Sequence, residues 1–399
     1  MEPYVVVIII SLILLGLACW ISPKRKGLAF WSVSFIAILP PSVLAGIRDF
    51  TIGTDINHYV VTNFVQALGY DNFFEFNKYI LQIQSDFVGL PNNTESGYNL
   101  LVFLVSRFTQ DAHWVLFFLE FLTLLFILLA AVKISKTLDI SPVYILAGQY
   151  GVHYLNSFNI MRQELAVAIL LLAMTYLISE QYKGYFLFQV IATFIHQSAL
   201  MGIIVAFIWV WFKNRKLRFS STLAFPLGIC GILVTAYAGR YVFMGIHYIA
   251  VNVPALSGFQ HSFDMTTAYT VTGILVFLAP EVLALLAIFV RNILVSEDSS
   301  IDSQKMEHTL IVMSILSLCL NTVYLYQNVI PRLALYFSIF TLILWPLIIK
   351  RSRGISKVTS MSLFIIAMCF VFWRVYTTDS GQIAPYSSQL LSEMIFDLK

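Results

Sequence analysis

The sequence predicts an all-α, polytopic integral membrane protein with roughly eleven to twelve helical segments, one of them a re-entrant or broken helix near His196. Two observations predict this class. Hydrophobic residues make up 59% of the chain and charged residues 11%, a composition that soluble globular domains do not have. The apolar residues also lie in stretches of about 20, the length of helix that crosses a bilayer.

The predicted spans are separated by short polar segments. In order along the chain they cover residues 4–21, 28–47, 113–132, 141–158, 163–180, 184–212, 221–239, 268–290, 309–327, 333–349 and 358–375. The first span has no small-residue cleavage site, so we expect a retained helix rather than a signal peptide. We expect residues 1–399 to form a single transmembrane domain.

Clusters of lysine and arginine between the spans indicate the orientation. They can all lie on one side of the membrane, which should be the cytoplasmic side. These clusters fall within residues 24–26, 133–136, 183, 213–218, 291–305 and 350–357. Both termini are then expected on the outer face of the membrane, toward the periplasm or the cell exterior.

The orientation decides how two ambiguous apolar segments are interpreted. Residues 98–110 are apolar, but a spanning helix there would move Lys133 outside, so we expect a short helix on or dipping into the outer face. Residues 184–212 have a lysine next to each end, and about 29 residues exceed the length of one crossing. Two short arms that meet near His196 would keep both charged ends inside.

The outer face carries almost only arginine among its cations. A membrane protein normally keeps its cations on the cytoplasmic side, so outer arginines need a reason, and bidentate binding of an anion such as phosphate supplies one. Arg107, Arg240 and Arg374 have the least distinctive neighbours and are expected to be interface anchors. The outer arginines are Arg48, Arg107, Arg162, Arg240, Arg332 and Arg374.

Common cofactor and metal motifs do not occur in the chain. The four cysteines lie inside apolar spans, which indicates neither a disulfide framework nor a zinc cluster. No nucleotide-binding loop, dinucleotide fingerprint or paired metal-ligand motif is found. We therefore expect no cofactor, no metal and no nucleic-acid partner.

The functional site should lie in the outer loops 48–112 and 240–267, because these are the largest polar segments. Glu120 and Glu281 lie inside predicted spans, where we expect each carboxyl group to be paired or protonated.

The first outer loop holds the densest group of polar residues. Asp55 can cap a helix predicted over 57–68, and Glu95 can be a helix-start residue. Both carboxylates can also belong to a binding site, because Arg48 shares their loop. The polar residues of this loop are Arg48, Asp49, Thr54, Asp55, Tyr59, Glu95 and Tyr98.

Three further candidates begin or interrupt predicted spans. Arg162, followed by Gln163, either extends to the lipid headgroups or lines a polar cavity. His196 lies in an apolar stretch, where a structural, hydrogen-bonded role and a catalytic role are both open. The third candidate is Arg332, with Tyr336 one helical turn later.

Taken in order, these motifs resemble one family. They are Arg48-Asp49, Gly53-Thr54-Asp55, Tyr59, Glu95-Ser96-Gly97-Tyr98, Met161-Arg162-Gln163, His196-Gln197-Ser198-Ala199-Leu200, Arg332, Tyr336 and Pro385-Tyr386. The arrangement is similar to the EpsG family of polysaccharide-polymerising membrane proteins, related in role to the Wzy O-antigen and capsule polymerases. Glu164 departs from the family's pattern, in which a small residue such as glycine is expected.

The resemblance implies a GT-C-like fold and a glycosyltransferase reaction on the outer leaflet. Such enzymes transfer the growing glycan from polyprenyl diphosphate to the terminal hydroxyl of the next lipid-linked repeat. The implied partners are the polyprenyl-diphosphate-linked oligosaccharide, membrane lipid, a chain-length regulator and a flippase. The product is an O-antigen, a capsule or an exopolysaccharide.

This reaction suggests roles for the candidate residues. We expect Arg48, Arg162 and Arg332 to bind the diphosphate, because arginines at helix starts stabilise a leaving anion. Asp55 is the first choice for the base that takes the acceptor proton and His196 the second. Glu95 is the third catalytic candidate and can instead bind sugar hydroxyls. Supporting roles are expected for Asp49, Tyr59, Gln163 and Tyr336.

Other classes of function stay open. A flippase for lipid-linked oligosaccharides also needs arginines for the diphosphate, but it should have cations deep within its spans and internal repeats. A ligase that transfers finished glycan to another acceptor would use nearly the same chemistry. A non-catalytic assembly subunit is least favoured, because it would not need so many polar groups at one membrane face.

Overall fold

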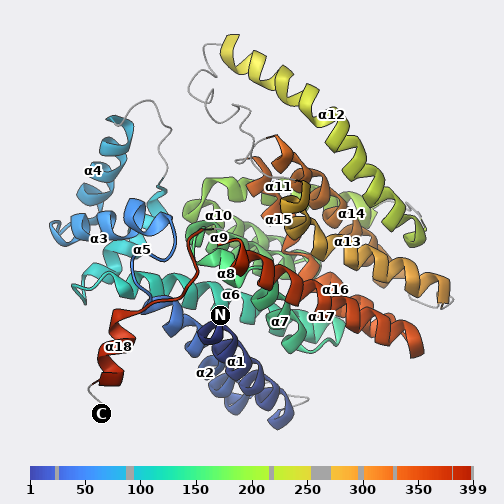
Figure 1. Ribbon diagram of the computed structural model, residues 1–399, viewed down its shortest axis with the longest axis horizontal. Helices are drawn as coiled ribbons and strands as arrows, with labels where there is room; N and C mark the ends of the chain where they lie inside the picture. The colour runs from blue at the N-terminus through green and yellow to red at the C-terminus, as the bar shows by residue number, and fades with distance from the viewer. Residues whose placement is uncertain are drawn as a thin grey trace. The chain divides into compact units, whose positions relative to one another are not determined.

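The computed structural model describes residues 1–22, 27–86, 94–214, 220–252, 271–294, 301–326, 330–379 and 381–396. Within these ranges every regular element is a helix. Eight of the described helices are long and apolar enough to cross a membrane, or nine if one bent pair counts as a span. The predicted all-α, multi-pass membrane class is confirmed (Figure 1).

The described residues divide into two compact units. The first contains those within 1–86, 94–199 and 372–396, and the second those between 200 and 371. Four helices of spanning length build the first unit: α1 (Glu2–Ile21), α2 (Leu28–Gly46), α6 (His113–Leu138) and α9 (Met161–Ile178). Each lies on a predicted span, because an uninterrupted apolar stretch identifies such a helix from sequence.

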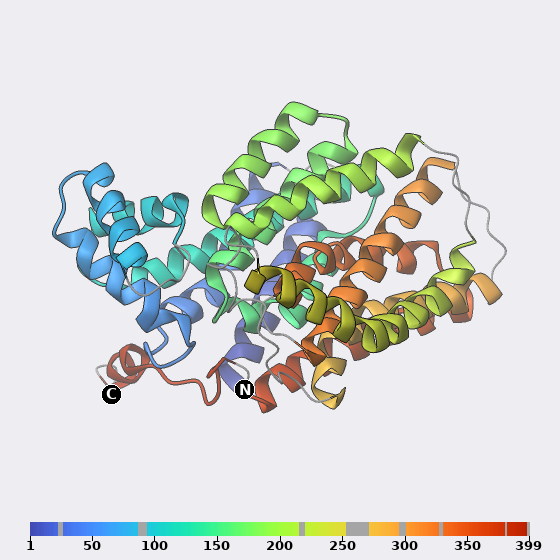
Figure 2. The same ribbon diagram turned by 90° about the horizontal axis from the view of Figure 1, so that it is seen from above.

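Helix α9 is the central helix of this unit. Helices α1 and α2 lie side by side (Figure 1 and Figure 2), α2 packs on α6, and α6 packs on α9. In the most apolar 18-residue stretch of each helix, 83% of the residues are buried in α9 and 22% in α1. Polar groups on its first turn are therefore held by protein neighbours.

The predicted span over residues 141–158 is interrupted. It consists of α7 (Pro142–Val152) and α8 (Tyr154–Ser157), with His153 at the junction. Neither piece has the length of a span. Ser141 caps the start, because its Oγ accepts a hydrogen bond from the backbone N–H of Val143.

The predicted break near His196 is confirmed. Helix α10 (Tyr182–Ile195) ends there, because the backbone of His196 is extended, with φ −153° and ψ 121°. A 3-10 turn (Gln197–Leu200) and α11 (Met201–Asn214) follow. Helix α10 packs along α9, so the residue after its last turn lies beside the central helix.

Short helices fill the segment between α2 and α6. They are a π-helical turn (Ile56–Val60), α3 (Val61–Leu68), α4 (Phe73–Asp86) and α5 (Ser96–Ser106). The helices expected over 57–68 and 98–110 are present, whereas α4 was not expected. Helices α3, α4 and α5 pack together (Figure 1). The contacts include Phe76 of α4 stacked on Phe103 of α5 and a 2.6 Å hydrogen bond from Arg107 to the Ala67 carbonyl oxygen. Arg107 therefore ties α5 to α3.

The second unit contains the longest helix. After α11, the second unit contains a 3-10 turn (Ser221–Leu223), α12 (Ala224–Asn252), α13 (Val271–Leu294), α14 (Ile301–Thr322), further 3-10 turns (Val323–Leu325, Ile330–Ala334), α15 (Leu335–Ser338) and α16 (Thr341–Arg351). It also contains α17 (Gly354–Thr377) up to residue 371. The expected outer loop 240–267 begins as a continuation of α12, since its aromatic and aliphatic residues extend the helix through Asn252. Residues 253–267 lie outside the described residues. The segments Pro331–Ser338 and Thr341–Arg351 form the bent pair, at 40°.

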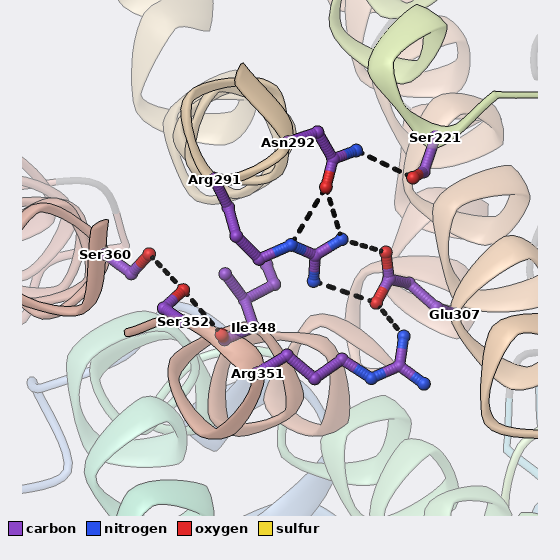
Figure 3. Close-up of polar contacts among 8 residues, drawn as sticks. All are labelled: Ser221, Arg291, Asn292, Glu307, Ile348, Arg351, Ser352 and Ser360. Atoms are coloured by element: carbon purple, nitrogen blue, oxygen red, sulfur yellow. Dashed lines mark hydrogen bonds and ion pairs between the residues drawn. The ribbon is translucent and has the colours of Figure 1, made fainter. Parts of the chain in front are cut away.

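A buried charge cluster ties the helices of the second unit together (Figure 3). Both oxygens of Glu307 on α14 accept hydrogen bonds from Arg291 on α13, at 2.7 and 3.0 Å. Arg351 of α16 bonds to the same carboxylate. Asn292 accepts from Arg291 and donates to Ser221 at 2.7 Å. Arg291 and Arg351 were predicted from sequence as cytoplasmic charges, and here they join three helices to one another.

Glu120 and Glu281, the two carboxylates that the sequence singled out inside spans, have hydroxyl partners. The Ser157 hydroxyl donates to Glu120 at 2.5 Å, and the Ser317 hydroxyl donates to Glu281 at 2.7 Å. Each group therefore has a partner, one of the two states expected from the sequence. A hydrogen-bond donor is what a carboxylate in an apolar surrounding requires.

Candidate active site

Glu95 is the centre of a polar cluster in the first unit. Its Oε1 accepts hydrogen bonds from Nδ1 of His196 at 2.7 Å and from the backbone N–H of Gln197 at 2.9 Å. Its Oε2 accepts from Nη1 of Arg162 at 2.8 Å. Three residues that the sequence singled out separately, Glu95, Arg162 and His196, therefore meet in one place.

A glycine and a helix end explain how the chain reaches this geometry. Gly97, two residues after Glu95, lies against the end of α10, where a Cβ would be 2.5 Å from the carbonyl oxygen of Phe194. Only glycine permits so close an approach. Because α10 ends at His196, the N–H of Gln197 is not used within that helix and donates to Glu95 instead.

Two tyrosine rings surround the guanidinium of Arg162. The centre of the guanidinium is 4.4 Å from the ring of Tyr59 and 5.3 Å from that of Tyr98, distances at which a cation and an aromatic face attract. Burial raises the pKa of Tyr98, and the charge of Arg162 opposes this shift. Arg162 is thus packed inside the protein, not extended toward the headgroups.

Exposure differs among the three members of the cluster. The side chain of Glu95 is 8% exposed and that of Arg162 is 12% exposed, whereas that of His196 is 25% exposed. A ligand that approaches the cluster therefore meets the imidazole most easily. The carboxylate is the least exposed of the three groups.

The charge state of Glu95 follows from its surroundings. Burial alone would raise its pKa, but the hydrogen bond and charge of His196, the charge of Arg162 and the N–H of Gln197 together hold the pKa of Glu95 below its ordinary value. An ionised carboxylate only accepts hydrogen bonds, so Nδ1 of His196 carries the hydrogen. In neutral His196 the lone pair is then on Nε2, which can accept a proton.

Helix capping is not the role of either candidate carboxylate. Asp55 precedes the π-helical turn and Glu95 precedes α5, and neither side chain makes a capping bond there. Asp55 is close enough to Tyr98 to affect the pKa of that phenol. The backbone next to Asp55 is held by Asn159, which accepts hydrogen bonds from the N–H and the hydroxyl of Thr54.

Arg48 lies deeper than the other predicted anion contacts, with 1% of its surface exposed. Its Nη2 donates to the carbonyl oxygen of Phe158 at 3.0 Å and contacts the sulfur of Met161 at 3.1 Å. Burial lowers the pKa of the guanidinium to about 10. Arg48 thus holds the chain immediately before Arg162. Its contact with a diphosphate stays a prediction.

Asp49 binds the C-terminal segment of the first unit. Its Oδ1 accepts a hydrogen bond from the N–H of Gln389, at the start of α18 (Gln389–Phe396), at 2.8 Å. The hydroxyl of Tyr386 donates to the Leu44 carbonyl oxygen, and the N–H of Gly53 donates to that of Gln382. Asp49 therefore supports the loop that leads to Asp55 and Tyr59.

The remaining predicted residues are divided between the two units. Gln163 is buried beside Arg162 on α9. Arg332 and Tyr336 belong to the second unit, where Arg332 is exposed on a 3-10 turn and Tyr336 is buried in α15. Their roles stay predictions.

Sequence patterns could not identify all the contacts of the site. The N–H of Gln197 is a backbone group, and it meets Glu95 across 102 positions of the chain. Asn159 carries no motif that marks it as a partner of Thr54. Tyr98 belongs to a motif that the sequence singled out, but its contact with Arg162 is visible only in the structure. Among the described residues, no group of three or more His, Cys, Asp or Glu side chains is placed to hold a metal ion.

Comparison with known proteins gives one family. The sequence profile of the EpsG family matches residues 31–388 of the chain, a range that contains Glu95, Arg162 and His196. No curated protein and no solved structure gives a significant match. Because the profile covers nearly the whole chain, the protein belongs to the EpsG family of Wzy-like polysaccharide polymerases.

Proposed function

We propose that this protein polymerises lipid-linked oligosaccharide repeat units on the outer leaflet of the bacterial inner membrane. The growing glycan is transferred from polyprenyl diphosphate to the next lipid-linked repeat. The observation that carries the proposal is the position of Glu95 between Arg162 and His196. This arrangement joins a base and a cation, the two groups that the transfer needs.

His196 is the proposed base. The terminal hydroxyl of the acceptor repeat attacks the anomeric carbon of the donor sugar, and its proton passes to Nε2 of His196. The bond between the anomeric carbon and the diphosphate oxygen breaks, and polyprenyl diphosphate leaves. Glu95 is the positioning residue, since its carboxylate holds the hydrogen on Nδ1 and orients the ring.

The charges of the cluster suit an anionic leaving group. With Glu95 ionised, Arg162 protonated and His196 neutral, the cluster has no net charge. When His196 takes the proton, the cluster gains one positive charge as negative charge grows on the diphosphate. Arg162 then contributes its guanidinium at the start of α9, where fixed donors stabilise the anion most.

Asp55, the first choice from the sequence, is now the alternative base. His196 is preferred because the hydrogen bond of its Nδ1 to Glu95 orients the ring and a quarter of its side chain is exposed. Replacing each in turn separates the two: loss of polymer in His196→Asn with polymer retained in Asp55→Asn supports His196, and the reverse supports Asp55.

Arg48 and Arg332 have different places in the proposal. Arg48 acts through the chain segment that carries Arg162, because it bonds to the carbonyl oxygen of Phe158 and contacts Met161. Arg332, exposed on its 3-10 turn, is kept as a proposed diphosphate contact. Loss of polymer in Arg332→Ala, with Arg240→Ala as the matched outer-face control, tests that contact.

The test of the whole proposal is an assay with purified protein and a lipid-diphosphate oligosaccharide. A ladder of products is expected, and it should be absent in Arg162→Ala and in Arg162→Lys, because an ammonium does not reproduce a guanidinium fork. A single transfer to another acceptor would indicate a ligase. Movement across the bilayer without new glycosidic bonds would indicate a flippase, and either result contradicts a polymerase.

A further inference from the structure

A second polar cluster lies inside the first unit, on the helix pair α7 and α8. The backbone N–H of His153 donates to the carbonyl oxygen of Gln149, and that of Ser157 donates to the carbonyl oxygen of His153, both at 2.9 Å. Residues four apart on such a helix share one face. Gln149, His153 and Ser157 therefore form a polar stripe, and all three are buried.

Two carboxylates from neighbouring helices meet this stripe. Glu120 of α6 accepts the hydrogen bond of Ser157, and Glu164 of α9 is 3.2 Å from Nδ1 of His153 through its Oε1. Glu120 and Glu164 are 3% and 1% exposed. Three packed elements thus bring their polar groups to one place within an apolar bundle.

Several polar atoms of this cluster have no hydrogen-bond partner among the described residues. They are both side-chain polar atoms of Gln149, Nε2 of His153, Oε1 of Glu120 and Oε2 of Glu164. Such atoms are rare in folded proteins, because a buried group without a partner is destabilising. Their gathering on three adjacent elements points to a common partner that is not protein.

The types of atom identify that partner. Since Nδ1 of His153 faces a carboxylate, neutral His153 presents an acceptor at Nε2. The carboxylate oxygens are acceptors as well, whereas the Gln149 amide both donates and accepts. A cation would satisfy the oxygens and leave the amide NH₂ without an acceptor. Water donates and accepts, and buried water typically makes about three hydrogen bonds to groups of this kind.

We infer that Gln149, His153, Glu120 and Glu164 bind ordered water molecules in the core of the first unit. These waters lie next to the first turn of α9. Arg162 in that turn bonds to Glu95 of the candidate active site. Glu164, two residues later, contacts His153 of the water site. The departure of Glu164 from the family's pattern thereby acquires a role.

X-ray hydroxyl-radical footprinting in ¹⁸O-labelled water tests the inference on the whole protein in nanodiscs. Bound water converted to radicals labels the side chains beside it, even where bulk solvent has no access. His153 is expected to take up ¹⁸O although it is 0% exposed, whereas Met174 of α9, also 0% exposed, is expected to stay unlabelled. Equal, background labelling of both residues would overturn the water site.

A substitution gives an independent measurement. Gln149→Leu removes two of the unpartnered atoms and is expected to reduce the labelling of His153 to the level of Met174 and to lower Tm. The matched control is Thr123→Val on α6, whose buried hydroxyl bonds to the Leu119 carbonyl oxygen; it should leave the labelling of His153 unchanged. A higher Tm in Gln149→Leu would show that the amide was dry and unpaired, which contradicts the inference. The footprint of the unsubstituted protein decides the matter if Gln149→Leu does not fold.

Discussion

Replacing Glu95 with glutamine is the most direct test of the polar cluster. The substitution keeps the size of the side chain and removes its charge. Oε1 accepts two hydrogen bonds and Oε2 accepts one, so the amide oxygen of the variant should stay at the position of Oε1. The amide NH₂ then faces the guanidinium of Arg162, and two donors oppose each other.

The loss of stability can be estimated from this geometry. A hydrogen bond to a charged group contributes about 1.5–3 kcal/mol, and breaking a fully buried ion pair costs about 3–5 kcal/mol. The side chain of Arg162 is 12% exposed and keeps its contact with Tyr59, so we expect the lower end of that range, about 3 kcal/mol. The same loss in the transition state would slow polymerisation about 100-fold.

A double-mutant cycle measures the interaction itself. The free energy of unfolding in mixed micelles is compared for Glu95→Gln, Arg162→Gln and the double variant. Each single change leaves a charged or donor group without its partner, whereas the double change removes both, so we expect a coupling energy of about 1.5–3 kcal/mol. Glu75→Gln on the exposed face of α4 is the control and should change neither stability nor the product ladder. Additive effects, within about 0.5 kcal/mol, would refute the ion pair.

Three further predictions concern the same cluster. His196→Asn keeps a donor for Glu95 but no base, so it should abolish the product ladder and change the free energy of unfolding by only about 1 kcal/mol; a normal ladder would exclude His196 as the base. Because the pKa of Glu95 is lowered in the folded protein, its contribution to stability is complete above the ordinary carboxyl pKa and is lost as pH falls through the lower, folded-state value. Tm should therefore fall more steeply in acid for the unsubstituted protein than for Glu95→Gln, and parallel curves would count against this. In Gly97→Ala the new Cβ meets the carbonyl oxygen of Phe194, so α5 must shift, with an expected cost of about 1–3 kcal/mol and a shorter ladder; unchanged values for both would show that the contact is not needed.

Part of the fold is predictable from local composition. Helices α1, α2, α6 and α9 lie on predicted spans because each is a long apolar stretch with polar ends. The break at His196 is predictable as well, since lysines adjoin both ends of an apolar segment too long for one crossing. Helix α4 was missed because it is neither long nor strongly apolar. The extension of α12 was missed because arginine at position 240 resembled the end of a span.

The sequence by itself determined that this is a multi-pass membrane protein, and its motifs indicated the family and singled out Glu95, Arg162 and His196. Only the tertiary structure decided that these residues meet. Glu95 is 67 positions from Arg162 and 101 positions from His196, and no local pattern specifies such a contact. It depends on the packing of α10 along α9 and on the approach of Gly97 to Phe194. Composition sets which segments enter the membrane, because transfer from water depends on each segment alone, whereas the partners of a buried charge depend on the packing of all its neighbours.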